Sequence, residues 1–162
     1  MVNIKNLALT LGKHEIFSDF NLEIARGEKV AIIGGEGSGK STLLDIMAGR
    51  VLPTNGDVKI SGEVLSVNGS VYADFSELRM AEMSAVDKLK RALRGLNDDE
   101  IILLLDEPTK NLDADGIDWL IKFLQRHENL TCVIVSSDRY FFATDLLAYD
   151  SPWRDEYRHD KN

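Results

Sequence analysis

Apolar residues follow two different spacings along this chain. From Val2 to Leu11 and from Phe17 to Ile24 they alternate loosely with polar residues, which predicts two strands that are each buried on one face. The runs Val30–Ile33 and Ile101–Leu105 are apolar at every position, as strands covered on both faces require. The mostly apolar segment from Leu43 to Ala48 predicts a helix. Together these segments predict an α/β fold.

Short strand-like pieces follow the first predicted helix, which should end near Gly49. Pro53–Gly56 is a turn signal, and the pieces lie at 58–60, 63–67 and 70–72, separated by glycine and asparagine. They predict a small antiparallel sheet that flanks the core.

Helical spacing returns after this region. Its apolar positions are Phe75, Leu78, Val86, Leu89, Leu93 and Leu96. Two capping pairs are available, Asp74 with Glu77 and Ser84 with Asp87, so either one long helix or two short ones would fit. A further amphipathic helix is predicted to begin at Asp113.

A glycine-rich loop lies between the Val30–Ile33 run and the helix that follows it, and it fits the pattern G-x-x-x-x-G-K-[ST]. Its residues are Gly34, Gly35, Glu36, Gly37, Ser38, Gly39, Lys40, Ser41 and Thr42. Glycines allow the backbone N–H groups to approach phosphate oxygens closely. We expect Lys40 to reach the β- and γ-phosphates and the Ser41 hydroxyl to ligate Mg²⁺. The loop therefore predicts a nucleotide site.

Two acids, Asp106 and Glu107, stand at the end of the Ile101–Leu105 run. The carboxyl ends of buried parallel strands are where open sheets bind ligands. We expect Asp106 to hold the Mg²⁺ shell through water or through Ser41, and Glu107 to polarise the water that attacks the γ-phosphate. Catalytic residues would then be Glu107 and Lys40, and the metal ligands Ser41 and Asp106.

Composition narrows the classes of partner. The chain of 162 residues suits one domain, which we place at 1–150, with a charged tail at 151–162. A net charge of −8 argues against nucleic acid as a partner and favours nucleotide or protein. The single Cys132 lies in an apolar run, so we expect it to be buried. No apolar stretch is long enough to cross a membrane, which predicts a cytoplasmic protein or a peripheral subunit of a membrane complex.

Together, these motifs resemble those of ATP-binding-cassette (ABC) ATPases. The glycine-rich loop, Leu105–Thr109 and Lys110–Asp113 are similar, in that order, to the Walker A, Walker B and D-loop motifs. Asp115–Leu120 and Val135–Phe141 are similar to segments of the ABC-F subgroup. The resemblance spans about residues 1–149 and implies a RecA-like P-loop NTPase core with a small antiparallel β-subdomain. It also implies MgATP binding, with each nucleotide held between one loop and a partner's signature segment.

This sequence departs from the family pattern in two regions that, in the family, take part in the ATP-bound dimer. Asp106 follows Lys40 more closely than in the family, and the missing length corresponds to its helical subdomain, which we take to be largely deleted. The segment Met83–Lys90 aligns with the LSGGQ signature, but Ala85 and Val86 replace its glycines. Side chains there would obstruct the close approach of backbone to a γ-phosphate.

Three further departures concern the nucleotide itself. Ser137 stands at the position of the family's switch histidine, and no glutamine lies near Ala73–Asp74, where the Q-loop would be. Leu11 falls at the position of the aromatic residue that stacks on adenine. The resemblance therefore predicts phosphate-centred binding with reduced catalytic accessories.

Three functions are compatible with these observations. The first is an MgATP-binding ABC-type ATPase whose hydrolysis is slow or depends on a partner, such as a complete ABC subunit. The second is a regulatory or adaptor subunit that binds nucleotide without hydrolysing it and acts through another protein. The third is a small P-loop kinase, against which the D-loop resemblance of Lys110–Asp113 speaks.

Overall fold

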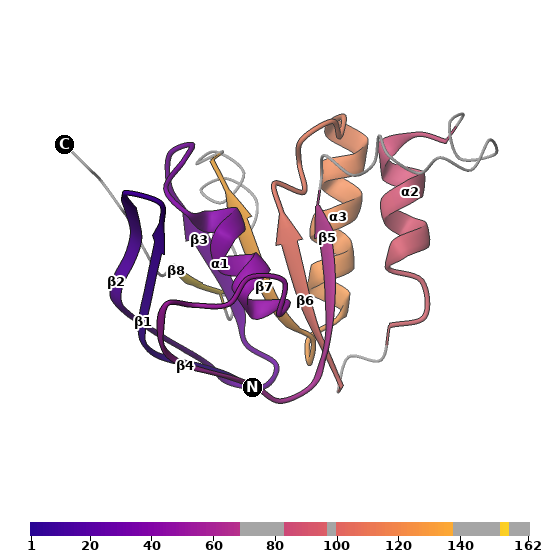
Figure 1. Cartoon of the computed structure of the whole chain (residues 1–162). Coiled ribbons are helices and arrows are strands. Elements are labelled where there is room, and N and C mark those ends of the chain that lie inside the picture. Colours follow the sequence, from indigo (N-terminus) through magenta and orange to yellow (C-terminus); the bar gives the residue numbers. More distant parts are fainter. Residues whose placement is uncertain (69–82, 97–99, 138–152, 156–162) are drawn as a thin grey trace.

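Two sheets of different kinds form the body of the molecule (Figure 1). The computed structural model describes residues 1–68, 83–96, 100–137 and 153–155. Its strands are β1 (Val2–Leu11), β2 (His14–Ile24), β3 (Lys29–Ile33), β4 (Asn55–Ile60), β5 (Glu63–Asn68), β6 (Ile101–Asp106), β7 (Thr131–Ser136) and β8 (Trp153–Asp155). Its helices are α1 (Lys40–Met47), α2 (Ala85–Ala92) and α3 (Ala114–Arg126).

The first sheet is antiparallel and has the strand order β2-β1-β4. β1 and β2 pair from Val2 opposite Ile24 to Leu11 opposite His14, and β4 pairs with the other edge of β1. The two predicted strands before the glycine-rich loop are therefore confirmed.

The second sheet is parallel, with the order β5-β6-β7-β3-β8. In its centre β6 and β7 are buried almost throughout, which explains why their sequences are apolar on both faces. All paired strands run the same way, so the carboxyl ends of β3, β5, β6 and β7 meet at one edge of the sheet. The expected fold class, an α/β P-loop core with a small antiparallel sheet, is confirmed.

Each face of the parallel sheet faces its own apolar core. On one face, α1 and the antiparallel sheet pack against alternate β6 residues such as Ile102 and Leu104. On the other face, α2 and α3 pack against Leu103 and Leu105 (Figure 1). Cys132 of β7 faces this second core and is fully buried, as expected, and burial raises the pKa of its thiol. The parallel sheet is thus covered on both faces, and the edge formed by the carboxyl ends of its strands is where a ligand site is expected.

One strand does not pair as predicted. The piece at 63–67 was expected in the antiparallel sheet, but β5 pairs in parallel with β6, from Glu63 opposite Ile101 to Asn68 opposite Asp106. The reason is that the chain turns at Ser61–Gly62, where Gly62 has a φ of +138°, and leaves the antiparallel sheet after β4. The piece at 58–60 does lie in β4 and pairs with β1, whereas 70–72 lies outside the described residues.

The predicted helix caps at Ser84 and Asp113 are confirmed. Ser84 caps α2, accepting a hydrogen bond from the Asp87 N–H at 3.2 Å, and Asp113 caps α3, accepting one from the Gly116 N–H at 2.9 Å. The alternative pair, Asp74 with Glu77, lies outside the described residues. Each cap satisfies a backbone N–H in the first turn of its helix.

The segment predicted as a charged tail contributes β8, which pairs in parallel with the outer side of β3. Lys29 lies opposite Trp153 and Ala31 opposite Asp155 in this pairing. Three residues of the 151–162 segment therefore extend the sheet. Within the described part of the chain, no helix has the length and apolar character needed to cross a membrane.

Candidate functional site

The glycine-rich loop joins the end of β3 to the start of α1. Gly37 and Gly39 adopt φ values of +75° and +90°, in the left-handed region that glycine tolerates. A Cβ on Gly34 would lie 2.8 Å from Ser38 Oγ, so the loop has no room for a side chain at that point. The Ser38 hydroxyl is buried and has no hydrogen-bond partner among the described residues. A buried donor without a partner at a helix N-terminus is suited to a phosphate oxygen.

Lys40 lies inside this loop. Its ammonium donates hydrogen bonds to the carbonyl oxygens of Gly34 at 2.7 Å and Gly35 at 2.8 Å, and the residue is 8% exposed. An ammonium has three N–H groups, so the two loop contacts fix its place and leave a further donor for a ligand. Glu36 is exposed on the loop, and Thr42 is half-buried in the first turn of α1.

Gly39 offers a direct test of the loop geometry. A Cβ at this position would lie 2.8 Å from Ile16 Cγ2 and 3.1 Å from Phe17 Cζ, in a conformation that is strained for alanine. We expect Gly39→Ala to lower the free energy of unfolding by about 2–4 kcal/mol, the sum of backbone strain and overpacking. Urea unfolding of the nucleotide-free protein measures this loss.

Gly35→Ala is the matched control. Its Cβ would have no heavy atom within 4 Å, and its φ lies outside the left-handed region, so the change should stay within about 0.5 kcal/mol. Equal losses in the two variants would show that the loop is not held in the described conformation.

Asp106 connects the glycine-rich loop to the parallel sheet. Its Oδ1 accepts a hydrogen bond from the Ser41 hydroxyl at 3.0 Å, so the two expected metal ligands are in contact. Only 7% of Asp106 is exposed. Burial raises the pKa of its carboxyl above the ordinary value, and the Ser41 hydrogen bond opposes this rise. A hydroxyl and a carboxylate placed together are oxygen ligands of the kind that Mg²⁺ takes, so the residues present fit this ion.

Asn68 is a member of the site that the sequence analysis missed. Its Nδ2 donates to Asp106 Oδ2 at 2.9 Å, so each carboxylate oxygen of Asp106 accepts one hydrogen bond. Asn68 is the last residue of β5 and lies opposite Asp106 in the parallel register. The available signal was a polar residue at the end of a strand, but it points to the site only if β5 runs parallel to β6. No glutamine stands at the Q-loop position of this sequence, and the side-chain amide that contacts Asp106 comes instead from Asn68 on the edge strand β5.

The raised pKa of Asp106 has a consequence for stability. A carboxyl whose pKa is raised in the folded state binds more protons in the native protein than in the unfolded chain, so stability falls as pH rises above the ordinary value of 3.8. Asn cannot ionise and escapes this loss. We therefore expect the stability of Asp106→Asn, relative to wild type, to increase with pH between the ordinary pKa of the carboxyl and its raised value and to level off above that, in urea unfolding without nucleotide and with a metal chelator.

Asp118→Asn is the control for this comparison, because Asp118 is an exposed residue of α3 paired with Lys122 at 2.6 Å. We expect no growing gain in stability with pH for this variant. A pH-independent difference between Asp106→Asn and wild type would contradict the burial effect.

Glu107 follows Asp106 and turns toward the end of β7. Its Oε1 accepts from the Ser137 N–H at 2.8 Å, and its Oε2 accepts from the Ser136 hydroxyl at 3.0 Å. The structure therefore brings the glycine-rich loop, Asp106 and Glu107 to one edge of the parallel sheet. Ser137, at the position of the switch histidine, contacts Glu107 through its backbone.

The segment aligned with the signature forms the start of α2. Ser84 Oγ accepts from the Asp87 N–H and also donates to Asp87 Oδ2 at 2.7 Å, so the hydroxyl that caps this helix is itself bonded to a carboxylate in the first turn. Lys90, one turn later, lies 5.4 Å from the ring centre of Trp119 on α3 and joins the two helices.

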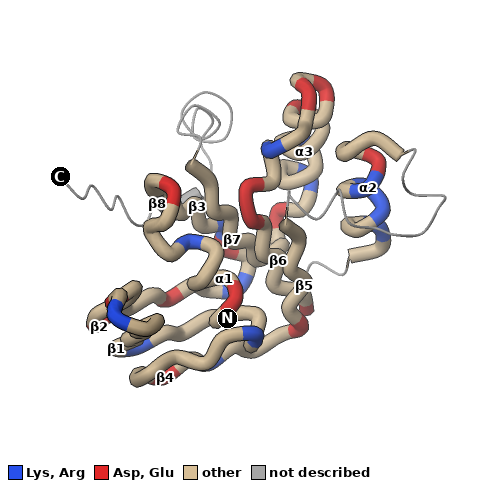
Figure 2. Tube along the Cα trace, turned by 45° about the horizontal axis from the view of Figure 1, so that its top comes forward, with Lys and Arg blue, Asp and Glu red and all other residues tan. Residues whose placement is uncertain are grey.

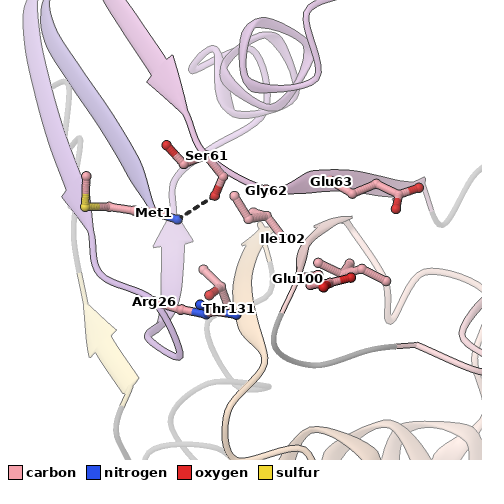
Figure 3. A pocket seen from close by; sticks show the side chains of 9 residues that line it. Met1, Arg26, Ser61, Gly62, Glu63, Glu100, Ile102 and Thr131 are labelled. Carbon is pink, nitrogen blue, oxygen red and sulfur yellow. Dashed lines mark hydrogen bonds between the residues drawn. The ribbon is translucent and has the colours of Figure 1, made fainter.

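A separate hollow of about 610 Å³ lies at the opposite edge of the parallel sheet (Figure 3). It is lined by Met1, Ser61 and Gly62, by charged side chains that include Arg26 and Glu63, and by the first residues of β6 and β7. The lining residues of β6 lie at its amino end, whereas the two acids follow its carboxyl end, and Arg26 lies before β3, whose carboxyl end leads into the glycine-rich loop. The hollow is therefore not part of the phosphate site.

The fold and the loop define a P-loop nucleotide-binding protein, and comparison with known proteins narrows the class. The family model described as ABC transporter matches residues 17–88. The zinc import ATP-binding protein ZnuC of Psychrobacter cryohalolentis is 30% identical over 184 residues, covering 87% of this chain and 75% of that protein. This chain therefore belongs to the family of ABC ATPases.

Other relatives are much longer than this chain. The ribosome protection protein VmlR of Bacillus subtilis is 32% identical over 160 residues, and this chain spans 29% of its length. ABC transporter F family members of Arabidopsis thaliana also match, as the motif wording predicted. Among solved structures, the ADP- and phosphate-bound dimer of the cassette MJ0796 aligns with a TM-score of 0.64 at 22% identity, covering 87% of this chain and 90% of that one. At that level of identity the likeness establishes the fold alone.

Proposed function

We propose that this chain binds MgATP at the glycine-rich loop and hydrolyses it slowly, or faster when a partner completes the site. The observation that carries the proposal is the contact between Ser41 Oγ and Asp106 Oδ1 at 3.0 Å. This contact joins the first turn of α1 to the acidic end of β6. It places the two proposed Mg²⁺ ligands together, next to the buried Lys40. Glu107 lies next to this pair with its carboxylate held by β7.

Each residue has a distinct role in this proposal. Lys40 and the loop N–H groups bind the β- and γ-phosphates, while Ser41 and Asp106 hold Mg²⁺. Mg²⁺, when bound, neutralises charge on the phosphate oxygens. Glu107 orients the attacking water and accepts its proton. Leu11, 50% exposed at the end of β1, offers no ring to stack on adenine, so binding should depend mainly on the phosphates.

A second function, nucleotide binding without hydrolysis in a regulatory or adaptor subunit, is favoured by α2. In an ATP-bound dimer of the family, the N-terminus of this helix would face a partner's γ-phosphate. Here the Ser84 hydroxyl already donates its hydrogen bond to the Asp87 carboxylate. Ala85 and Val86 place side chains where the family signature has glycines. A carboxylate at that end repels phosphate. We infer that this chain cannot complete a partner's site, although a complete ABC subunit could still complete the site of this chain.

The names of the relatives do not point to one process, since they include ribosome protection and zinc import. We therefore propose only the chemistry that the family shares, together with a protein partner in the cytoplasm or on a membrane complex. Basic residues gather on α2 (Figure 2), but the net charge of −8 still speaks against nucleic acid.

The decisive experiment measures nucleotide affinity and phosphate release by the purified chain at several protein concentrations. We expect MgATP and MgGTP to bind within about tenfold of each other, a difference of about 1.4 kcal/mol, because the base makes few contacts. Slow release that does not depend on protein concentration supports the hydrolytic proposal, and binding without any release supports the adaptor. Failure to bind either nucleotide would overturn both.

A further inference from the structure

Glu107 is tied to its surroundings at four polar atoms. Its backbone N–H donates to the Val135 carbonyl at 2.9 Å, and its own carbonyl accepts from the Lys110 N–H at 3.0 Å. Its carboxylate oxygens accept from the Ser137 N–H at 2.8 Å and the Ser136 hydroxyl at 3.0 Å. Three consecutive residues at the end of β7 thus hold this one residue. A freely rotating surface glutamate would not be held in this way.

The backbone of Glu107 is also held in an unusual conformation. Its φ is +46°, in the left-handed region that residues with a side chain seldom adopt. Such a conformation persists only where the surrounding structure enforces it, and it is concentrated at functional sites. Here the hydrogen bonds to β7 and to Lys110 enforce it, so the direction in which the side chain leaves the backbone is fixed.

Ser136 is the unusual member of this group. It is the last residue of β7, its exposure is 0%, and the rest of that strand is buried with it. Burying a hydroxyl is unfavourable unless it forms a hydrogen bond, and Ser136 directs one to Glu107 Oε2. The exposed Ser137 contributes only its backbone N–H to the carboxylate. Of these groups, Ser136 is the one that holds the Glu107 carboxylate through a side chain.

We propose that Ser136 is a positioning residue that orients the Glu107 carboxylate for the attack of water on the γ-phosphate. A carboxylate offers about four lone-pair positions, so two donors fix its plane and leave a position on each oxygen for water. Ser137 has no imidazole to do this. The inference rests on the proposed hydrolytic function, because it assigns the group through which Glu107 acts.

Amide hydrogen exchange, followed by NMR in nucleotide-free protein, tests the contact without any turnover. The Ser137 N–H is held by Glu107 Oε1. In Ser136→Ala the carboxylate loses its second donor and can rotate away, so Ser137 exchange should rise about tenfold. Ser136→Thr keeps the hydroxyl and should restore slow exchange. Exchange of Ile134, within β7, should stay the same in every variant and report that the strand is intact.

Single-turnover hydrolysis by the same variants tests whether this orientation of Glu107 matters for the reaction. We expect Ser136→Ala to lower the single-turnover rate about tenfold while MgATP affinity changes less than about twofold, and Ser136→Thr to recover most of the rate. Ser66→Ala is the matched control, since the Ser66 hydroxyl on β5 accepts from Arg50 at 3.0 Å, away from Glu107. It should match wild type in both measurements.

The outcomes separate the two proposals. If wild type hydrolyses MgATP, and Ser136→Ala changes neither the Ser137 amide exchange nor the single-turnover rate, the positioning role alone is overturned. Wild-type protein that never releases phosphate, yet shows exchange that depends on Ser136, would overturn the proposed hydrolysis and leave the contact established. A loss of MgATP affinity equal to the loss of rate would show that Ser136 supports the loop rather than Glu107.

Discussion

Lys40→Ala is expected to abolish the stabilisation of the fold by MgATP. A ligand present at about 100 times its dissociation constant should raise the free energy of unfolding of wild type by roughly 2.7 kcal/mol. Lys40 is the cation at the centre of the loop, fixed there by the Gly34 and Gly35 carbonyls. Its removal takes away the charge that faces the phosphates. Thermal or urea unfolding with and without MgATP measures the shift in each variant.

The nucleotide-free variant should also be less stable than wild type. Loss of the ammonium leaves the buried Gly34 carbonyl without its donor, which costs about 1–3 kcal/mol. The comparison must therefore use the ligand-dependent shift within each variant. Lys122→Ala is the control, because Lys122 lies on the exposed face of α3 and pairs with Asp118. A full MgATP shift in Lys40→Ala would refute the proposed site.

Glu107→Gln is expected to reduce phosphate release at least about 100-fold while MgATP affinity stays within about threefold of wild type. Loss of one group that acts on the reacting centre commonly costs about 10²–10³ in rate. An amide cannot accept the proton of the attacking water. The substitution is otherwise mild, because the Gln oxygen can accept from the Ser137 N–H and the Ser136 hydroxyl can turn to accept from the amide. Glu63→Gln is the control, because Glu63 begins β5 at the edge of the sheet away from Glu107. Its phosphate release should match that of wild type.

The same variant tests dimerisation. In an intact cassette, loss of the glutamate would trap an ATP-bound pair, whereas here the Ser84–Asp87 cap and the side chains of Ala85 and Val86 stand at the contact. Sedimentation of Glu107→Gln should therefore be the same with and without MgATP. An ATP-dependent dimer would contradict the role assigned to α2, and retained turnover would place the base elsewhere.

Sequence alone predicted the features whose causes are local. The glycine-rich loop, the acids after a buried run and the helix caps at Ser84 and Asp113 each depend on a few neighbouring residues. The contact between Ser41 and Asp106 could be anticipated because the loop that leads into α1 follows the carboxyl end of β3, and Asp106 ends the parallel strand β6. This rule needs only the direction of the strands.

Features that depend on strand pairing were not predictable in the same way. The segment 63–67 has a strand-like sequence, but nothing local distinguishes an antiparallel partner from the parallel β6. Because that pairing was wrong, Asn68 was not placed beside Asp106. Ser136 was overlooked for a related reason, since its partner Glu107 follows the neighbouring strand β6 and lies far away in the sequence.

Cys132 provides the chain with its own reporter of opening motions. It is the single cysteine, it is fully buried in the central strand β7, and burial keeps its thiol protonated by raising its pKa. A thiolate-directed alkylating reagent can therefore label it only after β7 separates from the layer of α2 and α3. The labelling rate would reveal how often the middle of this sheet opens under native conditions, and whether a bound nucleotide slows that event.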